Sequence, residues 1–362
     1  MNTQLSWNIK NKRPFLISGP CSAETEDQVM KVAQDLKSTG QIDLFRSGIW
    51  KPRTRPGAFE GVGDIGLQWL RRVKTELSLP VTVEVATANH VEKSLKAGID
   101  VLWIGARTTV NPFAVQEIAN ALQGTDIPVM IKNPVNPDLG LWIGATERIL
   151  GAGVENIAAI HRGFSSSGEK IYRNKPYWHI AIDYHQYFPQ IPLINDPSHI
   201  CGRRDLLFQI AQKAMDLEYD GLMLESHPNP DQAWSDAAQQ VTPKDYKHII
   251  DKLVIRKKIP DSSADINALE KFRHEIDAID DELLLILSSR MDIVRKIGAL
   301  KKSNKITILQ QDRWLQIFQK FMDRGLLNGL SEDFLNHLVK AIHDESIAQQ
   351  EHIMNLHDEE QE

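Results

Sequence analysis

The chain has 362 residues, which at ~150 residues per domain indicates about two domains. Hydrophobic residues make up 42% and charged residues 25%, as in ordinary globular proteins, which argues against long disorder or a fibrous repeat. A net charge of −6 provides no basic field for nucleic acid or an anionic membrane surface, and no apolar run approaches the ~20 residues of a membrane span. The polar start lacks the apolar core of a secretory signal, and Cys21 and Cys201 cannot build a disulfide framework. We therefore expect a cytoplasmic protein with no nucleic-acid or membrane partner.

Two kinds of segment alternate along the first 230 residues. Short apolar runs, often β-branched, predict strands at 15–19, 43–47, 81–85, 101–104, 129–132, 157–160, 193–196 and 221–225. Segments with helical spacing lie between them, at 26–39, 67–77, 90–97, 114–122, 145–150 and 206–217. This alternation predicts parallel βα units, and eight such units in roughly 250 residues fit a closed (β/α)8 TIM barrel of the α/β class. An open doubly wound sheet is the alternative, but no GxGxxG follows any predicted strand.

The composition changes near residue 256. Segment 256–265, RKKIPDSSAD, combines proline, paired serines and charges, as linkers do. Beyond it, apolar residues recur every three or four positions and predict helices at 265–302, 311–324 and 332–355. We therefore expect a barrel domain at 1–255, a linker at 256–265 and an all-helical domain at 266–362. The first helix would be roughly 57 Å long, too long to bury its apolar stripe within one small domain, so we expect an intertwined homodimer through the helical domain or a higher oligomer.

Basic side chains follow four of the predicted strands, where barrel enzymes carry their active sites. They are Arg46, Lys51, Arg53, Arg107, Lys132 and Arg162. Because guanidinium forks match phosphate and carboxylate, this set predicts a strongly anionic ligand. So many cations would serve two anionic substrates better than one.

Side chains that bind metals follow the first, seventh and eighth predicted strands. They are Cys21, His199, Glu225 and Asp236. A thiolate, an imidazole and two carboxylates suit a divalent transition metal, and the carboxylates extend the range to manganese. A mononuclear hydrolase would be one use of such a site. A Cys–His nucleophile pair is another, but it would leave the six cations unexplained.

The motifs at these strand ends resemble one enzyme family over residues 12–255. In chain order they are GPCS at Cys21, KPRT at Lys51, GAR at Arg107, DPSH at His199, ESHPNP from Glu225 and SDAAQ at Asp236. This series resembles the smaller, microbial barrel type of 3-deoxy-D-arabino-heptulosonate 7-phosphate (DAHP) synthase. The resemblance implies metal-dependent condensation of phosphoenolpyruvate with erythrose 4-phosphate, giving DAHP and phosphate at the start of aromatic biosynthesis.

The same resemblance assigns roles to individual residues. It implies that phosphoenolpyruvate is held by Arg46, Lys51, Arg107, Lys132 and Arg162. Arg53 and Thr54 would hold erythrose 4-phosphate, and Glu84 would orient a water molecule. Lys51 and His199 would be catalytic, and Cys21, His199, Glu225 and Asp236 would hold the metal.

Two departures from the family pattern concern loop contacts. NPVNPD follows Lys132 where many relatives have Arg-Gly, and His161 precedes Arg162 where an acidic residue is common. The sister enzyme that makes 3-deoxy-D-manno-octulosonate 8-phosphate shares the barrel. It typically carries Lys-Ala-Asn-Arg-Ser in place of KPRT, which makes it a distant alternative.

Two cations interrupt the apolar stripe of the first C-terminal helix. On a helical wheel, Arg290 lies in the middle of the stripe, and Lys301 falls on the same face about 16 Å further along. Cations inside an apolar stripe are costly unless an anion meets them. Arg273 falls off to one side, where it could not easily reach the same pocket.

This pattern, in LEKFRHEIDAIDDELLLILSSRMDIVRKIGALK and onward through Arg313, Ser346 and Gln350, resembles the all-helical chorismate mutase family over residues 266–352. The resemblance implies that Arg290, and Arg273 from a partner chain, meet the carboxylates of chorismate. Lys301 and Gln350 would hydrogen-bond the ether oxygen as prephenate forms, with Arg313 and Ser346 also binding substrate. Gln310 and Trp314 stand where the family often has acidic residues.

The sequence as a whole therefore predicts a bifunctional enzyme, DAHP synthase and chorismate mutase. We expect prephenate bound in the helical domain to exert feedback inhibition on the barrel reaction. The alternative is a DAHP synthase whose helical domain is catalytically dead and serves as a sensor and dimerisation unit. Retention of Arg273, Arg290, Lys301, Arg313 and Gln350 argues against a dead site.

Overall fold

The computed structural model describes residues 7, 9–51, 57 and 59–355. The chain divides into two compact units, Met1–Arg256 and Lys257–Glu362. Within the described residues, no helix is both long enough and apolar enough to cross a membrane.

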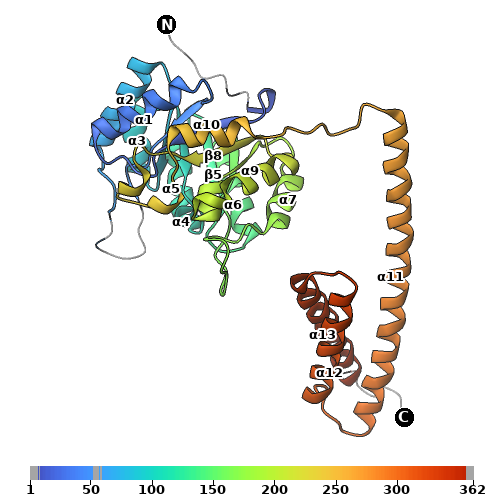
Figure 1. Ribbon diagram of the computed structural model, residues 1–362. Helices are drawn as coiled ribbons and strands as arrows, with labels where there is room; N and C mark the ends of the chain where they lie inside the picture. The colour runs from blue at the N-terminus through green and yellow to red at the C-terminus, as the bar shows by residue number, and fades with distance from the viewer. Residues whose placement is uncertain (1–6, 8, 52–56, 58, 356–362) are drawn as a thin grey trace. The chain divides into compact units, whose positions relative to one another are not determined.

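The first unit is a closed barrel of eight parallel strands, each hydrogen-bonded to the next and β8 to β1 (Figure 1). The strands are β1 (Phe15–Gly19), β2 (Leu44–Arg46), β3 (Val81–Val85), β4 (Val101–Ile104), β5 (Val129–Lys132), β6 (Ile157–His161), β7 (Leu193–Asn195) and β8 (Gly221–Glu225). This architecture confirms the predicted TIM barrel, and a doubly wound sheet is excluded because the sheet has no open edge.

Ten α-helices accompany the strands. They are α1 (Glu26–Ser38), α2 (Ile65–Leu77), α3 (Ala88–Ala97), α4 (Ala106–Thr109), α5 (Pro112–Leu122), α6 (Leu139–Gly151), α7 (Trp178–Tyr187), α8 (Pro197–Cys201), α9 (Leu207–Asp216) and α10 (Pro243–Asp251). Several begin at side-chain caps. Thr25, Thr87 and Asp138 each accept a hydrogen bond from a backbone N–H of the first turn of α1, α3 and α6.

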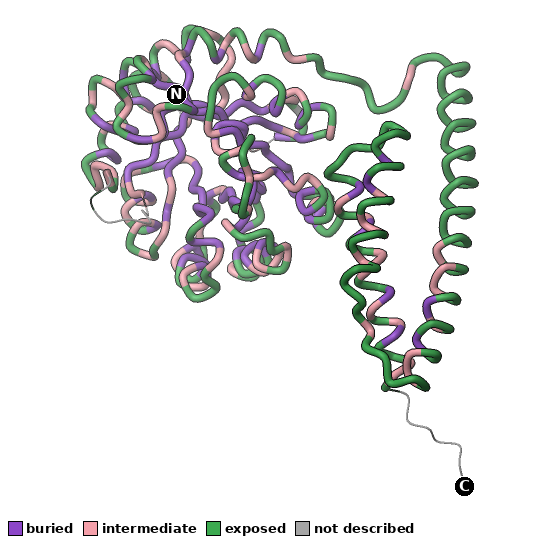
Figure 2. The backbone as a smooth tube through the Cα atoms, turned by 60° about the horizontal axis from the view of Figure 1, so that its bottom comes forward, coloured by how far each residue is buried: buried purple, intermediate pink, exposed green. Residues whose placement is uncertain are grey.

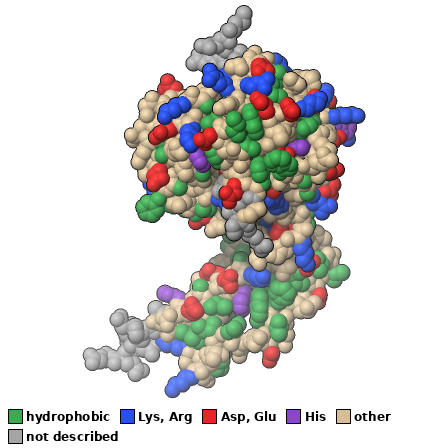
Figure 3. Space-filling model, turned by 90° about the vertical axis from the view of Figure 1, so that its left-hand side faces the viewer, with side chains coloured by type: hydrophobic (Ala, Val, Ile, Leu, Met, Phe, Trp, Pro, Cys, Tyr) green, Lys and Arg blue, Asp and Glu red, His purple; other side chains and the backbone are tan. Residues whose placement is uncertain are grey.

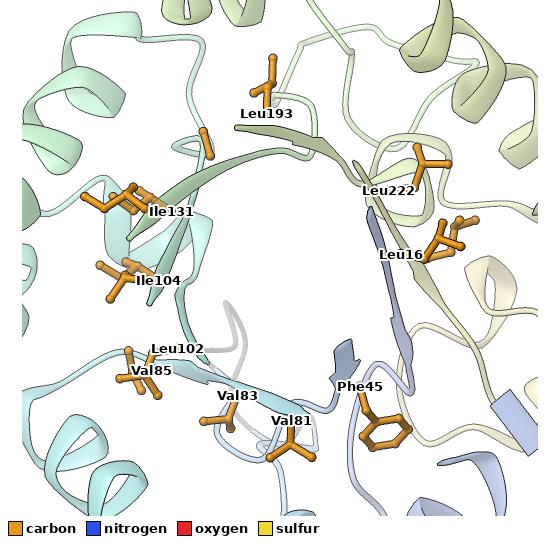
Figure 4. Packing of buried hydrophobic residues seen from close by; sticks show 14 of the residues in the cluster. Leu16, Phe45, Val81, Val83, Val85, Leu102, Ile104, Ile131, Leu193 and Leu222 are labelled. Carbon is orange, nitrogen blue, oxygen red and sulfur yellow. The ribbon is translucent and has the colours of Figure 1, made fainter. Parts of the chain in front are cut away.

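The alternation of side chains along the strands separates two apolar layers. Leu16 and Leu222 point out of the barrel toward the surrounding helices, as Figure 4 shows for ten labelled residues. Their neighbours Ile17 and Met223 belong to a second cluster, which also contains Trp103 and is formed mainly by alternate strand residues. The interior of the barrel is therefore filled by side chains, and groups that could bind a ligand lie at the ends of the strands.

The second unit consists of three helices, α11 (Ser263–Ser303), α12 (Gln311–Leu327) and α13 (Glu332–Asn355). The last part of α11 packs against α13, where Gly298 lies so close to Gln350 that a Cβ would be 3.3 Å from the Gln350 Cα. The first part of α11 is exposed within this chain (Figure 2). This confirms an all-helical second unit; the intertwined dimer stays a prediction.

Candidate functional site

A cavity of about 190 Å³ lies where the barrel strands end. It is lined by residues from the loops after β2, β3, β4, β5, β6, β7 and β8, namely Lys51, Glu84, Ala106, Arg107, Val135, Arg162, Arg173, Asn174, His199 and Asp236. Four of these side chains are basic groups that the sequence predicted for the site, namely Lys51, Arg107, Arg162 and His199. Asp236, which contacts Cys21, is a predicted acidic group in the same lining. Loops far apart in the sequence thus converge on one hollow because parallel strands all end on the same side of the barrel.

Three of the predicted metal ligands lie together. Ligand atoms of Cys21, His199 and Asp236 are all within 4.8 Å of one another. The Cys21 thiol donates to Asp236 Oδ2 at 3.0 Å. This donor set of sulfur, nitrogen and oxygen is one that a divalent transition metal accepts.

Glu225, the fourth predicted ligand, approaches from the end of β8. Its Oε1 lies 3.6 Å from His199 Nε2 and 3.1 Å from Arg46 Nη2. The side chain is fully buried, yet Oε1 has no hydrogen-bond partner among the described residues. Arg46 compensates the charge of this carboxylate, and its position beside His199 Nε2 is compatible with a fourth metal ligand.

The protonation of the cluster follows from its burial. Burial, with the neighbouring charge of Glu225, raises the pKa of the Cys21 thiol to about 12. Burial also lowers the pKa of His199, whose Nδ1 lies 2.7 Å from Asp196 Oδ2. A neutral His199 that donates from Nδ1 to Asp196 leaves its Nε2 lone pair for a ligand.

Asp196 links the histidine to the basic set. It is fully buried at the end of β7 and accepts from Lys132 Nζ at 2.9 Å as well as lying against His199. Although burial opposes its ionisation, His199 and Lys132 hold the pKa of Asp196 well below its usual range. Asp196 belongs to the DPSH motif, but its position in the sequence predicted no role for it.

Arg46 and Lys132 are buried at the ends of β2 and β5. Both cations lie over the Trp103 ring, at 5.0 Å for Arg46 and 5.9 Å for Lys132. Gly19, at the end of β1, leaves room for the backbone of Arg46, because a Cβ at position 19 would be 2.0 Å from the Arg46 carbonyl oxygen. The two cations are thus held on one buried aromatic ring, and neither is among the residues that line the cavity.

Lys51 and Arg162 lie at the cavity wall. Lys51 Nζ is 2.6 Å from Cys21 Sγ and 3.9 Å from Asp236 Oδ2, which joins the basic set to the metal-binding set. Arg162 is buried and donates to Asn174 Oδ1 at 2.7 Å. Burial lowers the pKa of Arg162 to about 10, which indicates that its charge is not fully compensated without an anion.

The remaining barrel predictions are placed as follows. Glu84 lines the cavity and accepts from Trp103 Nε1 at 3.1 Å, and Gly105 is required beside it because a Cβ there would be 1.9 Å from Glu84 Oε1. Arg107 also lines the cavity. Arg53 and Thr54 lie outside the described residues.

The structure adds site residues that the sequence analysis did not predict. Arg173, Asn174 and Gln239 contact the predicted residues directly: Arg173 donates to Asp236, Asn174 donates to the His199 carbonyl, and Gln239 donates to Glu225. None of them follows a strand directly. Because these residues lie in long loops, no helical or strand periodicity in the sequence marks them. They reach the site only in the folded chain.

A second group of polar residues lies where α11 packs on α13. Arg290 Nη1 donates to Ser346 Oγ at 2.6 Å, and burial lowers the pKa of Arg290. Gln350 is buried one turn further along α13, and its Oε1 has no hydrogen-bond partner among the described residues. Among the described residues no carboxylate pairs with Arg290, so a cation and an amide oxygen without a hydrogen bond both lie in this helix contact.

The other predicted residues of this unit lie apart from Arg290 in a single chain. Lys301 donates to the Ile308 carbonyl, and Arg313 is exposed and donates to Gln316 on its own helix. Arg273 pairs with Glu270 on α11, roughly 26 Å along the helix from Arg290 at ~1.5 Å per residue. Trp314 stacks on His343 with ring centroids 3.8 Å apart.

Fold and site together define a TIM barrel of the enzyme type, with basic and metal-binding side chains at its strand ends, joined to an all-helical unit. The DAHP synthetase I family matches residues 6–258, and chorismate mutase type II matches residues 272–351. The chain therefore belongs to the DAHP synthetase I family and carries a chorismate mutase domain after its barrel. These two domains make it a bifunctional enzyme of aromatic biosynthesis.

Individual relatives include an enzyme of the assigned kind and, at lower identity, an example of the sister enzyme. A phospho-2-dehydro-3-deoxyheptonate aldolase of Thermotoga maritima is 30% identical over 247 residues, which is 68% of this chain and 70% of the relative. A 2-dehydro-3-deoxyphosphooctonate aldolase of Albidiferax ferrireducens is 27% identical over 67% of this chain and 90% of its own length. The crystal structure of the Thermotoga maritima DAHP synthase superposes with a TM-score of 0.59 at 27% identity, covering 66% of this chain and 67% of that one.

Proposed function

We propose that the barrel condenses phosphoenolpyruvate with erythrose 4-phosphate to DAHP and phosphate. The observation that carries this proposal is the contact between two sets of groups in one cavity. Lys51 touches Cys21 and approaches Asp236, so anion-binding and metal-binding groups face the same small volume. Such a site suits a reaction between two anions, of which one carries a carbonyl that must be polarised.

We further propose that Cys21, His199, Glu225 and Asp236 hold a divalent metal, manganese or another transition metal. Support comes from the Cys21–His199–Asp236 cluster and from Glu225 Oε1, which faces His199 Nε2 at 3.6 Å. Such an ion, when bound, supplies Lewis acidity at the aldehyde oxygen and stabilises the Cys21 thiolate despite burial.

The cations would bind and orient phosphoenolpyruvate. Its carboxylate and phosphate would lie among Arg46, Lys51, Arg107, Lys132 and Arg162, with Arg53 and Thr54 on erythrose 4-phosphate. C3 of phosphoenolpyruvate then forms a bond to the aldehyde carbon, the C=O π bond breaks, its oxygen takes up a proton, and cationic character is left at C2. Water oriented by Glu84 adds to C2, its proton is released, and the C2–O bond to phosphate breaks. Lys51 and His199 would be the catalytic groups nearest these atoms.

For the helical unit we propose rearrangement of chorismate to prephenate. Arg290 and Ser346 would meet a carboxylate, while Gln350 and Lys301 would hydrogen-bond the ether oxygen, and Arg313 would add a further contact. The contact between Arg290 Nη1 and Ser346 Oγ supports this site, and Gln350 would donate to the ether oxygen from Nε2, which in the single chain donates to the Ser346 carbonyl. The reaction is unimolecular and needs no nucleophile or metal, so positioning and charge stabilisation suffice.

A homodimer through the helical unit belongs to this proposal. Apolar side chains of α11 ahead of Arg290 are largely exposed in the single chain, among them Phe272 (59%), Ile276 (57%) and Ile279 (63%). Figure 3 shows apolar side chains gathered on the surface of the helical unit. A second copy would cover this stripe and would bring its own Arg273 to the pocket of Arg290. We also propose domain limits of 1–255 and 266–362, with a linker between them. A cytoplasmic location is part of the same proposal.

Assays of the purified full-length protein test both reactions. Phosphate release should require phosphoenolpyruvate and erythrose 4-phosphate together, and chorismate absorbance should decay in a separate assay. A protein that releases phosphate but leaves chorismate untouched would be a DAHP synthase with a dead helical sensor domain.

A further inference from the structure

Asp236 uses its two carboxylate oxygens for different partners. Oδ2 lies 3.0 Å from Cys21 Sγ, within the cluster of proposed metal ligands. Oδ1 accepts a hydrogen bond from Arg173 Nη1 at 2.9 Å. Arg173 comes from the long loop between β6 and α7, and it therefore contacts the site from outside the ligand cluster.

Gln239 extends the same hydrogen bonding to the second carboxylate. Its Oε1 accepts from Arg173 Nη1 at 2.6 Å, and its Nε2 donates to Glu225 Oε2 at 2.7 Å. The other oxygen, Glu225 Oε1, is left without a hydrogen bond among the described residues and faces His199 Nε2 at 3.6 Å. Arg173 thus donates directly to Asp236 Oδ1 and is connected to Glu225 Oε2 through the amide of Gln239.

The surrounding backbone holds this pair in place. Gln239 is 1% exposed and lies in the short 3-10 helix Ala237–Gln239. Gly202 makes room for Arg173, because a Cβ there would be 2.5 Å from the Arg173 Cβ. Asp236 itself has φ +51°, a left-handed conformation that a non-glycine residue keeps only where its surroundings require it.

We propose that Arg173 and Gln239 are positioning residues that determine which oxygen of Asp236 and which oxygen of Glu225 faces the metal. This inference rests on the metal site of the proposed function. A surface ion pair would end at one carboxylate, whereas Arg173 continues through a buried amide to a second one. The carboxamide of Gln239 accepts from the arginine through its oxygen and donates to the carboxylate through its nitrogen, so that one side chain joins the two.

Equilibrium dialysis of the full-length protein against Mn²⁺, without substrates, tests the proposal. Gln239→Leu and Arg173→Met should each weaken Mn²⁺ binding about 10–100-fold, the range found when outer partners of metal ligands are removed. The matched control is Arg203→Met, which removes an exposed arginine that pairs only with Asp205 in this region. Its Mn²⁺ affinity should equal that of the wild type.

Two further variants separate positioning from a general structural role. Arg173→Lys offers one compact ammonium in place of the fork and should give an intermediate affinity. The double variant Arg173→Met/Gln239→Leu should lose less than the two single losses multiplied, because both residues act in one hydrogen-bonded chain. Thermal unfolding in the presence of chelator should be the same for Arg173→Met and wild type, since the exposed arginine is not part of the core.

The outcomes distinguish this inference from the metal site itself. If the wild type binds no Mn²⁺, both the metal site and the positioning role are wrong. If the wild type binds Mn²⁺ and the folded Arg173 variants bind it equally tightly, the positioning role alone is overturned. Strictly multiplicative losses in the double variant would also contradict it.

Discussion

Cys21 shows how the environment of one residue decides its chemistry. Its thiol is fully buried, and burial raises its pKa to about 12, so the free side chain is protonated and a poor nucleophile. This property argues against a Cys–His nucleophile pair, which would need a thiolate at neutral pH. A metal ion removes the thiol proton outright, so the same burial is compatible with a ligand.

Replacing the sulfur tests that interpretation. Cys21→Ser should lower Mn²⁺ affinity and the condensation rate by at least about tenfold, because a hydroxyl is a weaker metal ligand than a thiolate. Chorismate turnover should not change. Cys201→Ser is the matched control, since Cys201 is also a buried thiol but lies outside the ligand cluster. Equal losses in both variants would mean that Cys21 is only a packing residue.

Residues directly at the strand ends could be predicted from the sequence, whereas Arg173 and Gln239, which approach from long loops, could not. A barrel brings the carboxyl ends of its strands together, so Arg46, Lys132 and Glu225 could be grouped before any distance was known. Arg173 and Gln239 approach Asp236 and Glu225 only because two long loops fold over the site. Nothing in the spacing of those loops fixes how far apart they lie.

Strands and helices differ in how well the sequence predicts them. Each of the eight strands lies within one residue of its predicted limits at either end, because strands buried on both faces read as continuous apolar runs. Helix α7 (Trp178–Tyr187) was not predicted, since its sequence WHIAIDYHQY mixes aromatic residues and histidines without a clear apolar stripe. The short α4 and α8 carry little periodicity, and they are set by the strand ends that they follow.

Because α11 is long, we can predict how dimers that contain two different variant chains should behave. Arg273 lies roughly 26 Å from Arg290 along one helix, so one chain cannot bring both to one pocket. Arg273→Ala and Arg290→Ala should each abolish chorismate turnover. Coexpression of the two should restore roughly a quarter of the wild-type rate with random pairing, because half the dimers are hybrids with one intact pocket.

Each variant coexpressed with itself is the control for that experiment. If hybrids are verified by mass and still show no turnover, Arg273 serves its own chain, and the proposed arrangement of the dimer is wrong.

At the scale of the whole molecule, two compact units on one chain provide a route for feedback. We propose that prephenate, bound at the Arg290 pocket, inhibits condensation in the barrel. A coupling of ~1–3 kcal/mol would change barrel ligand affinity about 5–150-fold. Saturating prephenate should therefore slow phosphate release by the intact protein, and cleavage near Ser262 should leave an active barrel that does not respond. Unchanged rates in the intact protein would show that the two activities share a chain without coupling.

The central claim is that one chain carries two active sites with different physical requirements. In the proposed function, the barrel site would need a metal held by Cys21, His199, Glu225 and Asp236, whereas the helical site would need none. Treatment of one preparation with a strong chelator, followed by both assays, tests this claim most directly. The account predicts that condensation is abolished, that added Mn²⁺ restores it, and that chorismate turnover is unchanged throughout. Full condensation activity in protein shown to be free of metal would contradict it.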